Sequence, residues 1–445
     1  MMMAYRLTRS LVLFMLTVAL IARSGAEEKP VQTPAQGGWL HYRFVEHPKT
    51  GEVLVWDANK PETRPTITIT IPLDEWSRVA FRRHPRWWGV AGATSPDWID
   101  ALCLTKDALW LGSSGGGVWR RDTRTGRWEG HVSRFPDKIY SFLVREIFQH
   151  GNAIWVLTRG PHRYDLTEKT WQHYQDRGDA AFAASGRRLA LISWRQGPRL
   201  FEPKQDKFVP VAATRPLQFS GPLAIHDDTL WCTCWTENKE RKHGQPRFVQ
   251  TGLARWDLKS RHLTTITKEQ APVLSAAERS MNAGNRWIAA LFCTKEAVWI
   301  GTEWAGLFRY RVSDGRVDHW PLKNRRGFLS CVKRIVPADG RLYLVPCERK
   351  GCGASDTQSE TLMVLNLKTD LVEHIKLPEP RAVTAVACHG GWVWVGTTSG
   401  LLLLDAQNDK WVPLPVSCGT VRCIVADDTQ VWVGSNNGVF GWLKR

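Results

Sequence analysis

The chain has 445 residues, of which 43% are hydrophobic and 23% charged, and its formal net charge is +17. This apolar content is enough for a sizeable core and there is no low-complexity tract, so the composition excludes a disordered chain. A strongly basic surface favours anionic partners, and because no nucleic-acid-binding module signature is present we do not expect nucleic acid among them.

Residues 1–26 have the parts of an export signal. Arg6 and Arg9 precede an almost wholly apolar run over residues 11–22, and residues 24–26 supply the small side chains that a signal peptidase reads. The run is shorter than the roughly 20 residues that a membrane-spanning helix needs, so we expect cleavage near Ala26 rather than an uncleaved anchor. The mature protein is therefore predicted to be secreted or periplasmic, with no integral membrane segment.

Residues 27–100 contain two strand-like segments and precede the repeats. Between Pro65 and Pro72, isoleucine and threonine alternate over residues 66–71, which is the period of a β-strand with two different faces. Residues 53–57 (Val-Leu-Val-Trp-Asp) have the character of a third strand of the repeats that follow. We expect this N-terminal segment to contribute at least one strand to the domain at residues 101–445.

One segment recurs from residue 101 to the C-terminus. It consists of an apolar strand with a tryptophan, a glycine, a short polar turn and a second apolar strand, and its clearest versions contain Trp110, Trp299, Trp394 and Trp432. A unit this short cannot bury its own hydrophobic face, so it has to stack against copies of itself.

Eight such units can be placed by their second strands, which contain Trp110, Trp155, Leu189, Trp231, Trp299, Tyr343, Trp394 and Trp432. Most separations are close to the roughly 40–50 residues of a four-stranded blade. The sequence therefore predicts an all-β fold, a single β-propeller with eight blades, or with seven if the weak unit around Leu189 is not a blade. The last unit ends without a fourth strand, and we expect residues 66–71 to supply it and close the ring.

The tryptophans and cysteines of the repeats also have predictable positions. Because the tryptophans occupy a fixed place in each repeat, we expect them to pack between neighbouring blades rather than to stack on sugars. Cys103, Cys293 and Cys388 are expected to be small buried residues on the first strand of a blade. Export permits disulfides, and the pairs Cys347 with Cys352 and Cys418 with Cys423 are close enough in sequence to close small loops.

Three units carry a recognisable repeat motif. These are Trp299-Ile-Gly-Thr302 with residues 306–310 (Gly-Leu-Phe-Arg-Tyr), Trp394-Val-Gly-Thr397 with Gly400-Leu401, and Trp110-Leu-Gly112 with Gly116-Gly-Val118. The motif resembles the two-component regulator propeller repeat, and the resemblance covers most of residues 101–445. It implies a propeller of the kind that forms the extracytoplasmic sensor of membrane-bound histidine kinases, although this sequence shows no kinase or output domain.

Motifs for catalysis or cofactor binding are missing from the sequence. It has no His-Glu-x-x-His segment, no nucleophile elbow, no phosphate loop and no EF-hand loop, so we expect neither a cofactor nor a metal. Histidines such as His131 and His162 are expected at the surface. A ligand site is expected in the loops that join the second and third strands on one face around the propeller channel. The candidate residues are Arg159, His162, Trp194, Arg195, Trp235, Glu303, Trp304, Arg349, Thr398 and Asn436.

The sequence is compatible with two functions. The first is an exported, non-enzymatic, sensor-like module that binds a protein partner or an anionic glycan. The alternative is a propeller-type lyase or hydrolase that acts on an anionic polysaccharide, because basic and aromatic side chains on the channel face suit such a substrate. Carboxylates for glycosidic acid–base chemistry converge only in three dimensions, so the sequence does not assign catalytic residues.

Overall fold

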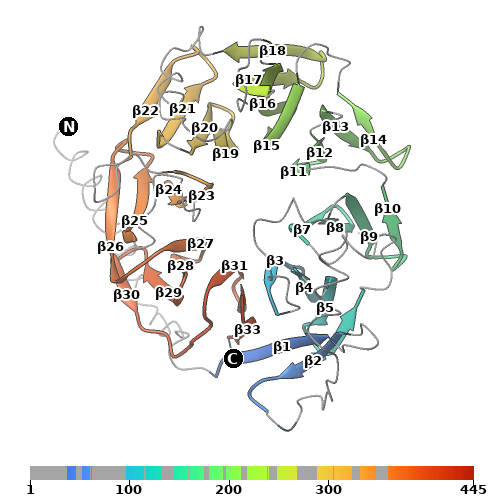
Figure 1. Ribbon diagram of the computed structural model, residues 1–445, viewed down its shortest axis with the longest axis vertical. Coiled ribbons are helices and arrows are strands. Elements are labelled where there is room, and N and C mark those ends of the chain that lie inside the picture. Colours follow the sequence, from blue (N-terminus) through green and yellow to red (C-terminus); the bar gives the residue numbers. More distant parts are fainter. Residues whose placement is uncertain are drawn as a thin grey trace, which may run out of the picture.

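The computed structural model describes residues 38–46, 53–60, 62, 97–114, 117–131, 144–158, 160–174, 180–193, 197–211, 218–237, 239, 248–267, 288–303, 305–322, 331–346 and 359–444. The strands of these ranges form eight antiparallel sheets arranged in a ring, which is the predicted eight-bladed β-propeller (Figure 1). We number the blades 1 to 8 in chain order. The predicted export signal at residues 1–26 and the strand-like residues 66–71 lie outside the described ranges.

Each blade begins with an inner strand beside the axis of the ring (Figure 1). The inner strands are β3 (Ile99–Leu104), β7 (Glu146–His150), β11 (Ala180–Ser185), β15 (Gln218–His226), β19 (Ile288–Cys293), β23 (Arg334–Ala338), β27 (Val383–His389) and β31 (Val421–Ala426). The second strands are β4 (Ala108–Ser113), β8 (Ala153–Leu157), β12 (Arg188–Ser193), β16 (Thr229–Glu237), β20 (Ala297–Thr302), β24 (Arg341–Val345), β28 (Trp392–Thr397) and β32 (Gln430–Ser435). All eight second strands predicted from the repeats are confirmed, including the weak one at Leu189.

The outer half of each blade follows the same order. The third strands are β5 (Gly117–Asp122), β9 (Pro161–Asp165), β13 (Gly197–Glu202), β17 (Phe248–Asp257), β21 (Leu307–Arg311), β25 (Ser359–Asn366), β29 (Gly400–Asp405) and β33 (Gly438–Leu443). The fourth strands of blades 1 to 7 are β6 (Trp128–Gly130), β10 (Trp171–His173), β14 (Lys207–Pro210), β18 (His262–Thr267), β22 (Val317–Trp320), β26 (Val372–Arg381) and β30 (Lys410–Val412).

Blade 8 takes its outer strands from the N-terminal segment. β1 (Leu40–Glu46) pairs antiparallel with β33, and β2 (Val53–Asp57) adds a fifth strand beside β1. The assignment of the fourth-strand position to residues 66–71 is therefore wrong, because residues 40–46 occupy it. Pairing an N-terminal strand with C-terminal strands in one sheet joins the two ends of the ring and leaves no unpaired edge at β33.

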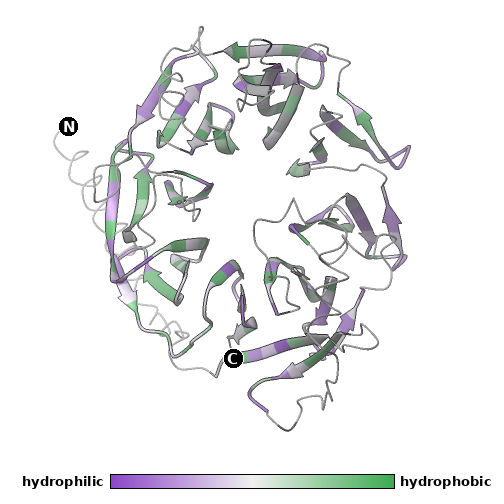
Figure 2. Cartoon of the chain, viewed as in Figure 1, coloured by the Kyte–Doolittle hydropathy of each residue, from purple (hydrophilic) through white to green (hydrophobic). Residues whose placement is uncertain are grey.

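The hydrophobic core lies between neighbouring blades. One cluster joins Trp110 and Val118 of blade 1 to Ile154 and Tyr164 of blade 2, and seven further clusters are described around the ring. The repeat tryptophans are 3% exposed or less, and Trp110 contacts Tyr164 with ring centroids 5.0 Å apart. Packing between blades is thus confirmed as the role of these tryptophans. Figure 2 shows hydrophobic stretches in strands all round the ring.

In blades 1, 5, 7 and 8 the glycine two residues after the repeat tryptophan has a steric role. Gly112, Gly301, Gly396 and Gly434 lie within second strands rather than in the turns that follow. A Cβ atom on Gly301 would lie 2.5 Å from the carbonyl oxygen of Val332 at the start of blade 6. The glycine therefore lets the first residues of the next inner strand approach the second strand closely.

The described cysteines are free thiols. Cys103 and Cys293 are buried on inner strands as predicted, and burial raises the pKa of the Cys103 thiol to about 11. Cys418 and Cys423 are both buried and unpaired, so the disulfide considered for them is not formed. Cys347 and Cys352 lie outside the described residues.

Candidate functional site: a charged cluster around the propeller axis

The inner strands begin at the end of the axis where the loops between second and third strands lie. In blades 1, 7 and 8 the loop after the second strand donates a backbone hydrogen bond to the residue just before the inner strand: Ser114 to Trp98, Thr398 to Ala382 and Asn436 to Thr420. The start of the next inner strand in turn bonds the preceding blade, as Val332 donates to Thr302 over 2.8 Å. Side chains at the first positions of the inner strands therefore share one end of the molecule with these loops.

Several of those first positions are charged. A β-bulge follows Ile99 in blade 1 and Val421 in blade 8, and the bulged residues are Asp100 and Arg422. Such bulges re-aim a side chain away from the regular alternation. In blades 2 and 6 the corresponding positions, next to Val144 and Val332, carry Arg145-Glu146 and Lys333-Arg334. We call these six residues, Asp100, Arg145, Glu146, Lys333, Arg334 and Arg422, the axial cluster.

Asp100 is paired with Arg422 of the neighbouring blade 8. Its carboxylate accepts hydrogen bonds from the Ser114 hydroxyl and the Arg422 Nε. The Arg422 guanidinium also lies over the Trp98 ring, 5.3 Å from the ring centroid. Burial raises the pKa of the Asp100 carboxyl, and the positive charges of Arg422, Arg334 and Lys333 act in the opposite direction.

Glu146 lies on the neighbouring inner strand. Its carboxylate accepts a 3.4 Å hydrogen bond from the Phe182 amide of blade 3. Burial raises the pKa of Glu146, whereas that hydrogen bond and the charges of Arg334 and Arg145 oppose the rise. The charge of Arg334 in blade 6 thus contributes to lowering the pKa of a carboxyl in blade 1 and of one in blade 2.

The cluster has a net positive charge and accessible cations. Arg145, Lys333 and Arg334 are exposed, whereas Asp100 and Arg422 are half-buried in contact with each other. Four basic groups face two carboxyls, one of which is paired. Exposed guanidinium groups beside a low-dielectric wall attract anions, and their planar fork suits carboxylates and sulfates.

The structure brings together two of the loop residues predicted for the site. The Thr398 carbonyl accepts a hydrogen bond from the Thr420 hydroxyl over 2.9 Å, and Asn436 Oδ1 accepts one from the Thr420 amide over 2.9 Å. Both loops therefore contact Thr420, which lies two residues before Arg422. Glu303 is half-buried in the loop after β20. The remaining loop candidates lie outside the described residues: Arg159, Trp194, Arg195, Trp304 and Arg349.

The other two predicted residues lie in strands rather than loops. Trp235 is buried in β16, and its indole N–H donates to the Thr233 hydroxyl over 2.9 Å. His162 is buried in β9, where its ring nitrogens lie 2.8 Å from Thr158 Oγ1 and 2.7 Å from His173 Nδ1. His131 is fully buried as well. The expectation that His131 and His162 are surface residues is therefore wrong, because both rings fill space within and between blades 1 and 2.

Sequence reasoning did not find the axial cluster, although a signal for it exists. In four blades a buried Ile or Val is followed at once by a charged residue at the start of the inner strand, as in Ile99-Asp100 and Val421-Arg422. Charged residues at the entrance of an otherwise apolar strand indicate a side chain that points away from the core.

Within the described ranges, no group of three or more His, Cys, Asp or Glu residues is arranged to hold a metal ion. These ranges also contain no helix of the length and apolarity needed to cross a bilayer.

Comparison with solved structures identifies proteins of similar fold. The computationally designed Ika8 protein is 13% identical with a TM-score of 0.55, over 79% of this chain and 97% of Ika8. Saccharomyces cerevisiae Sqt1 is 11% identical with a TM-score of 0.52, over 79% of this chain and 97% of Sqt1.

Extracellular domains from B. thetaiotaomicron are also similar. The domain assigned to the one-component system BT4673 is 15% identical with a TM-score of 0.47, and the match covers 79% of this chain and 39% of that chain. The domain assigned to the hybrid two-component system BT3049 is 15% identical with a TM-score of 0.41, over 78% of this chain and 40% of that chain. No protein-family model and no curated protein matches the sequence. At these identities, what this chain shares with the matched structures is the propeller fold.

Proposed function

We propose that this chain is an exported binding module whose ligand is anionic and whose site is the axial cluster. The observation that carries the proposal is the placement of four basic side chains at one end of the axis, at the starts of the inner strands of blades 2, 6 and 8. Arg334 and Arg422 lie in these strands, Arg145 and Lys333 directly precede them, and loops from blades 7 and 8 contact Thr420 beside them. Charged groups preorganised on a rigid scaffold are what a specific binding site requires.

The chemistry of the cluster favours an acidic glycan as the ligand. Lys333 and Arg334 are exposed and offer several N–H donors to carboxylate or sulfate groups. Asp100 and Glu146 can accept hydrogen bonds from sugar hydroxyls, and Trp98 provides an aromatic surface beside Arg422. The basic overall charge would bring a polyanion to the surface. The export signal at residues 1–26 supports a location outside the cytoplasm, and N-terminal sequencing of the mature protein tests it.

A binding titration with an acidic oligosaccharide and a neutral one of equal length tests the site. We expect Arg334→Gln to weaken binding of the acidic ligand by about tenfold or more, because a charge-assisted hydrogen bond contributes about 1.5–3 kcal/mol. Arg124→Gln is the matched control, since Arg124 is exposed at the turn between β5 and β6 and its loss removes the same charge. Equal weakening by both variants would mean that binding reflects overall charge and not this site.

An activity assay on the same ligands addresses the alternative of an enzyme. A binding module leaves the oligosaccharide intact after prolonged incubation. If the chain cleaved it, and Glu146→Gln abolished cleavage with binding retained, the lyase or hydrolase would replace the binding module as the function.

A further inference from the structure

A second feature of the fold is an arginine that recurs opposite the repeat tryptophan. The cross-strand pairs of the second and third strands are Trp110 with Arg120, Trp155 with Arg163, Trp231 with Arg255 and Trp299 with Arg309. The register thus places the same cation at the same position in blades 1, 2, 4 and 5. The groups that bind this arginine differ from blade to blade.

In blades 2 and 5 the arginine binds an aspartate of the next blade. Arg163 Nη1 lies 2.8 Å from Asp206 Oδ1, and Arg309 donates to both carboxylate oxygens of Asp370 over 2.8 Å. Both aspartates occupy the turn between the third and fourth strands, with φ of 47° and 58°. In these two blades, an aspartate at a turn position with positive φ therefore neutralises the arginine of the preceding blade.

Blade 5 has a glycine at that turn position. Gly315 donates its amide to the Arg311 carbonyl over 3.0 Å, as Asp370 does to Asn366 over 2.9 Å, and its φ is 70°. A Cβ atom on Gly315 would lie 3.6 Å from the Tyr310 hydroxyl. Tyr310 in turn contacts Trp231, with ring centroids 5.7 Å apart, and the Arg255 guanidinium lies 5.7 Å from the same Trp231 ring. The carboxylate that would meet Arg255 is missing.

Among the described residues, no carboxylate lies within ion-pair distance of Arg255, although its charge helps to lower the pKa of Asp257. Of the four arginines at this position Arg255 is the one that makes no ion pair within 4.0 Å to any described residue, and its buried Nε has no hydrogen-bond partner there. Asp257, two residues further on, accepts hydrogen bonds instead from the amides of Lys259 and Ser260 over 3.0 and 2.9 Å. Arg163 by contrast also binds Asp165 of its own blade over 2.8 Å.

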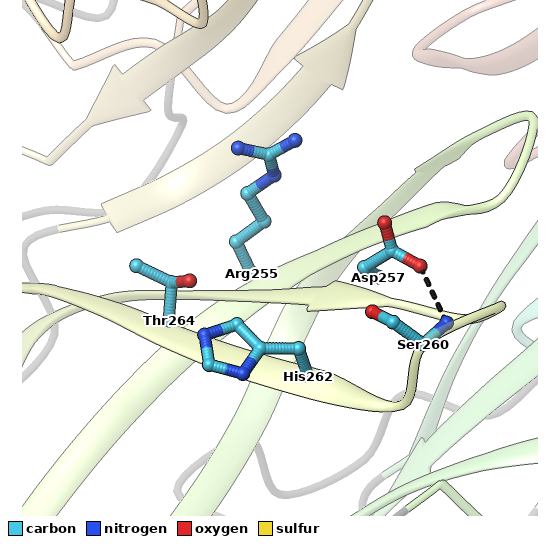
Figure 3. A pocket seen from close by; sticks show the side chains of 5 residues that line it. All are labelled: Arg255, Asp257, Ser260, His262 and Thr264. Carbon is cyan, nitrogen blue, oxygen red and sulfur yellow. Dashed lines mark hydrogen bonds between the residues drawn. The ribbon is translucent and has the colours of Figure 1, made fainter.

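A pocket of about 450 Å³ lies beside this arginine, lined by Arg255, Asp257, Ser260, His262 and Thr264. Figure 3 shows the Arg255 side chain rising on one side, with Thr264 and His262 below it and the Asp257–Ser260 pair on the other side. The volume falls within the range of about 300–1,000 Å³ typical of small-molecule sites. The lining offers the Arg255 cation, the Asp257 carboxylate and three further polar side chains.

We propose that this pocket is a second binding site, separate from the axial cluster, for a hydroxylated molecule that carries a single carboxylate, such as a hexuronate. The ligand carboxylate takes the place at Arg255 that Asp206 and Asp370 take at Arg163 and Arg309. Asp257 accepts hydrogen bonds from ligand hydroxyls, and its negative charge disfavours a second anionic group at that end. The proposal does not depend on the function of the axial cluster.

Calorimetric titration of the mature chain with D-glucuronate and with D-glucose tests the proposal. We expect glucuronate to bind and glucose not to bind. Arg255→Gln should weaken glucuronate binding by about tenfold or more, since it removes a charge-assisted hydrogen bond. Gly315→Asp should have the same effect for a different reason, because the new carboxylate would occupy Arg255 from within the chain.

Gly390→Asp is the matched control for the second variant. Gly390 also occupies a turn at positive φ, 57°, with no atom close to an added Cβ, so it accepts aspartate without reaching Arg255. Thermal melts establish that each variant is folded, and Gly315→Asp should melt no lower than Gly390→Asp because it restores an ion pair between blades. A titration with an oligosaccharide that ends in glucuronate, compared with free D-glucuronate, shows whether the pocket binds the end of a glycan or the free sugar acid more tightly.

Either of two results would overturn the proposal. One is the absence of glucuronate binding to the folded wild-type chain. The other is binding that persists at the wild-type affinity in both Arg255→Gln and Gly315→Asp, which would place the ligand elsewhere.

Discussion

His162 shows how burial changes the properties of a single side chain. The ring lies within blade 2, between Thr158 Oγ1 and His173 Nδ1, and has little contact with solvent. Burial, and then the nearby His173, lower the pKa of His162 to about 3 from its ordinary value of 6.5. The folded protein therefore keeps this ring neutral under conditions in which the unfolded chain would protonate it.

This difference predicts how stability depends on pH. Between pH 6.5 and 3 the unfolded state binds a proton at His162 that the folded state does not, so the free energy of unfolding falls as the pH is lowered. One such group contributes at most about 1.4 kcal/mol per pH unit. In His162→Gln we expect a shallower fall, measured by urea unfolding at intervals from pH 7 to pH 4. Identical slopes in the two proteins would show that His162 is protonated in the folded state.

At the scale of the element, a glycine in the second strands of blades 1, 5, 7 and 8 sets the distance to the next blade. Gly301 in β20 lies against the backbone of Val332, where an added Cβ would be 2.5 Å from the carbonyl oxygen. A backbone atom cannot rotate away as a side chain can, so the strand and its neighbour have to separate to admit a methyl group. The same construction recurs at Gly112, Gly396 and Gly434 against side chains of the next blade.

Gly301→Ala should therefore destabilise the fold, although alanine is the better residue in a strand on entropic grounds. We expect a loss of about 1–3 kcal/mol in the free energy of unfolding, the usual cost of overpacking a core. Gly38→Ala is the control, since no atom lies within 4 Å of its added Cβ. Denaturant unfolding of the two variants compares them, and equal stabilities would argue that the contact between blades 5 and 6 relaxes without cost.

At the scale of the whole molecule, closure of the ring depends on β1. Phe44 in this strand is 1% exposed and contacts both Trp119 and Trp128 of blade 1, with ring centroids 5.5 Å apart in each pair. The Asp97 carboxylate accepts hydrogen bonds from the Phe44 amide over 2.6 Å and from Arg43 over 2.7 Å. β1 thus belongs to the sheet of blade 8 and packs on blade 1, so it joins the first and last blades.

Phe44→Ala is expected to cost about 3–5 kcal/mol, the usual range for truncating a buried phenylalanine. The loss should be accompanied by faster amide hydrogen exchange in β33, because its pairing with β1 opens more often. Leu371→Ala, at a site 65% exposed, is the control and should leave both stability and exchange unchanged. Unchanged exchange in β33 in a destabilised Phe44→Ala protein would mean that β1 is not what holds the ring closed.

The sequence by itself determined the repeating blade and the order of the strands within it. Each repeat tryptophan, its glycine and the alternation of apolar residues report the local requirements of one blade, and eight such units were enough to predict the propeller. Even the weak unit at Leu189 formed a regular second strand, β12. These features are readable because a blade buries the same positions whichever neighbour it packs against.

Only the tertiary structure decided which residues meet. Residues 66–71 have the better strand pattern, yet residues 40–46 pair with β33, because an edge selects its partner by packing on the adjacent blade as well as by alternation. Asp100, Arg334 and Arg422 are far apart in sequence and converge because the ring brings its inner strands to one axis. The turn at Gly315 is 60 residues from Arg255 in the sequence, and only the packing of blade 5 on blade 4 places it beside Tyr310, whose ring contacts the Trp231 ring next to Arg255.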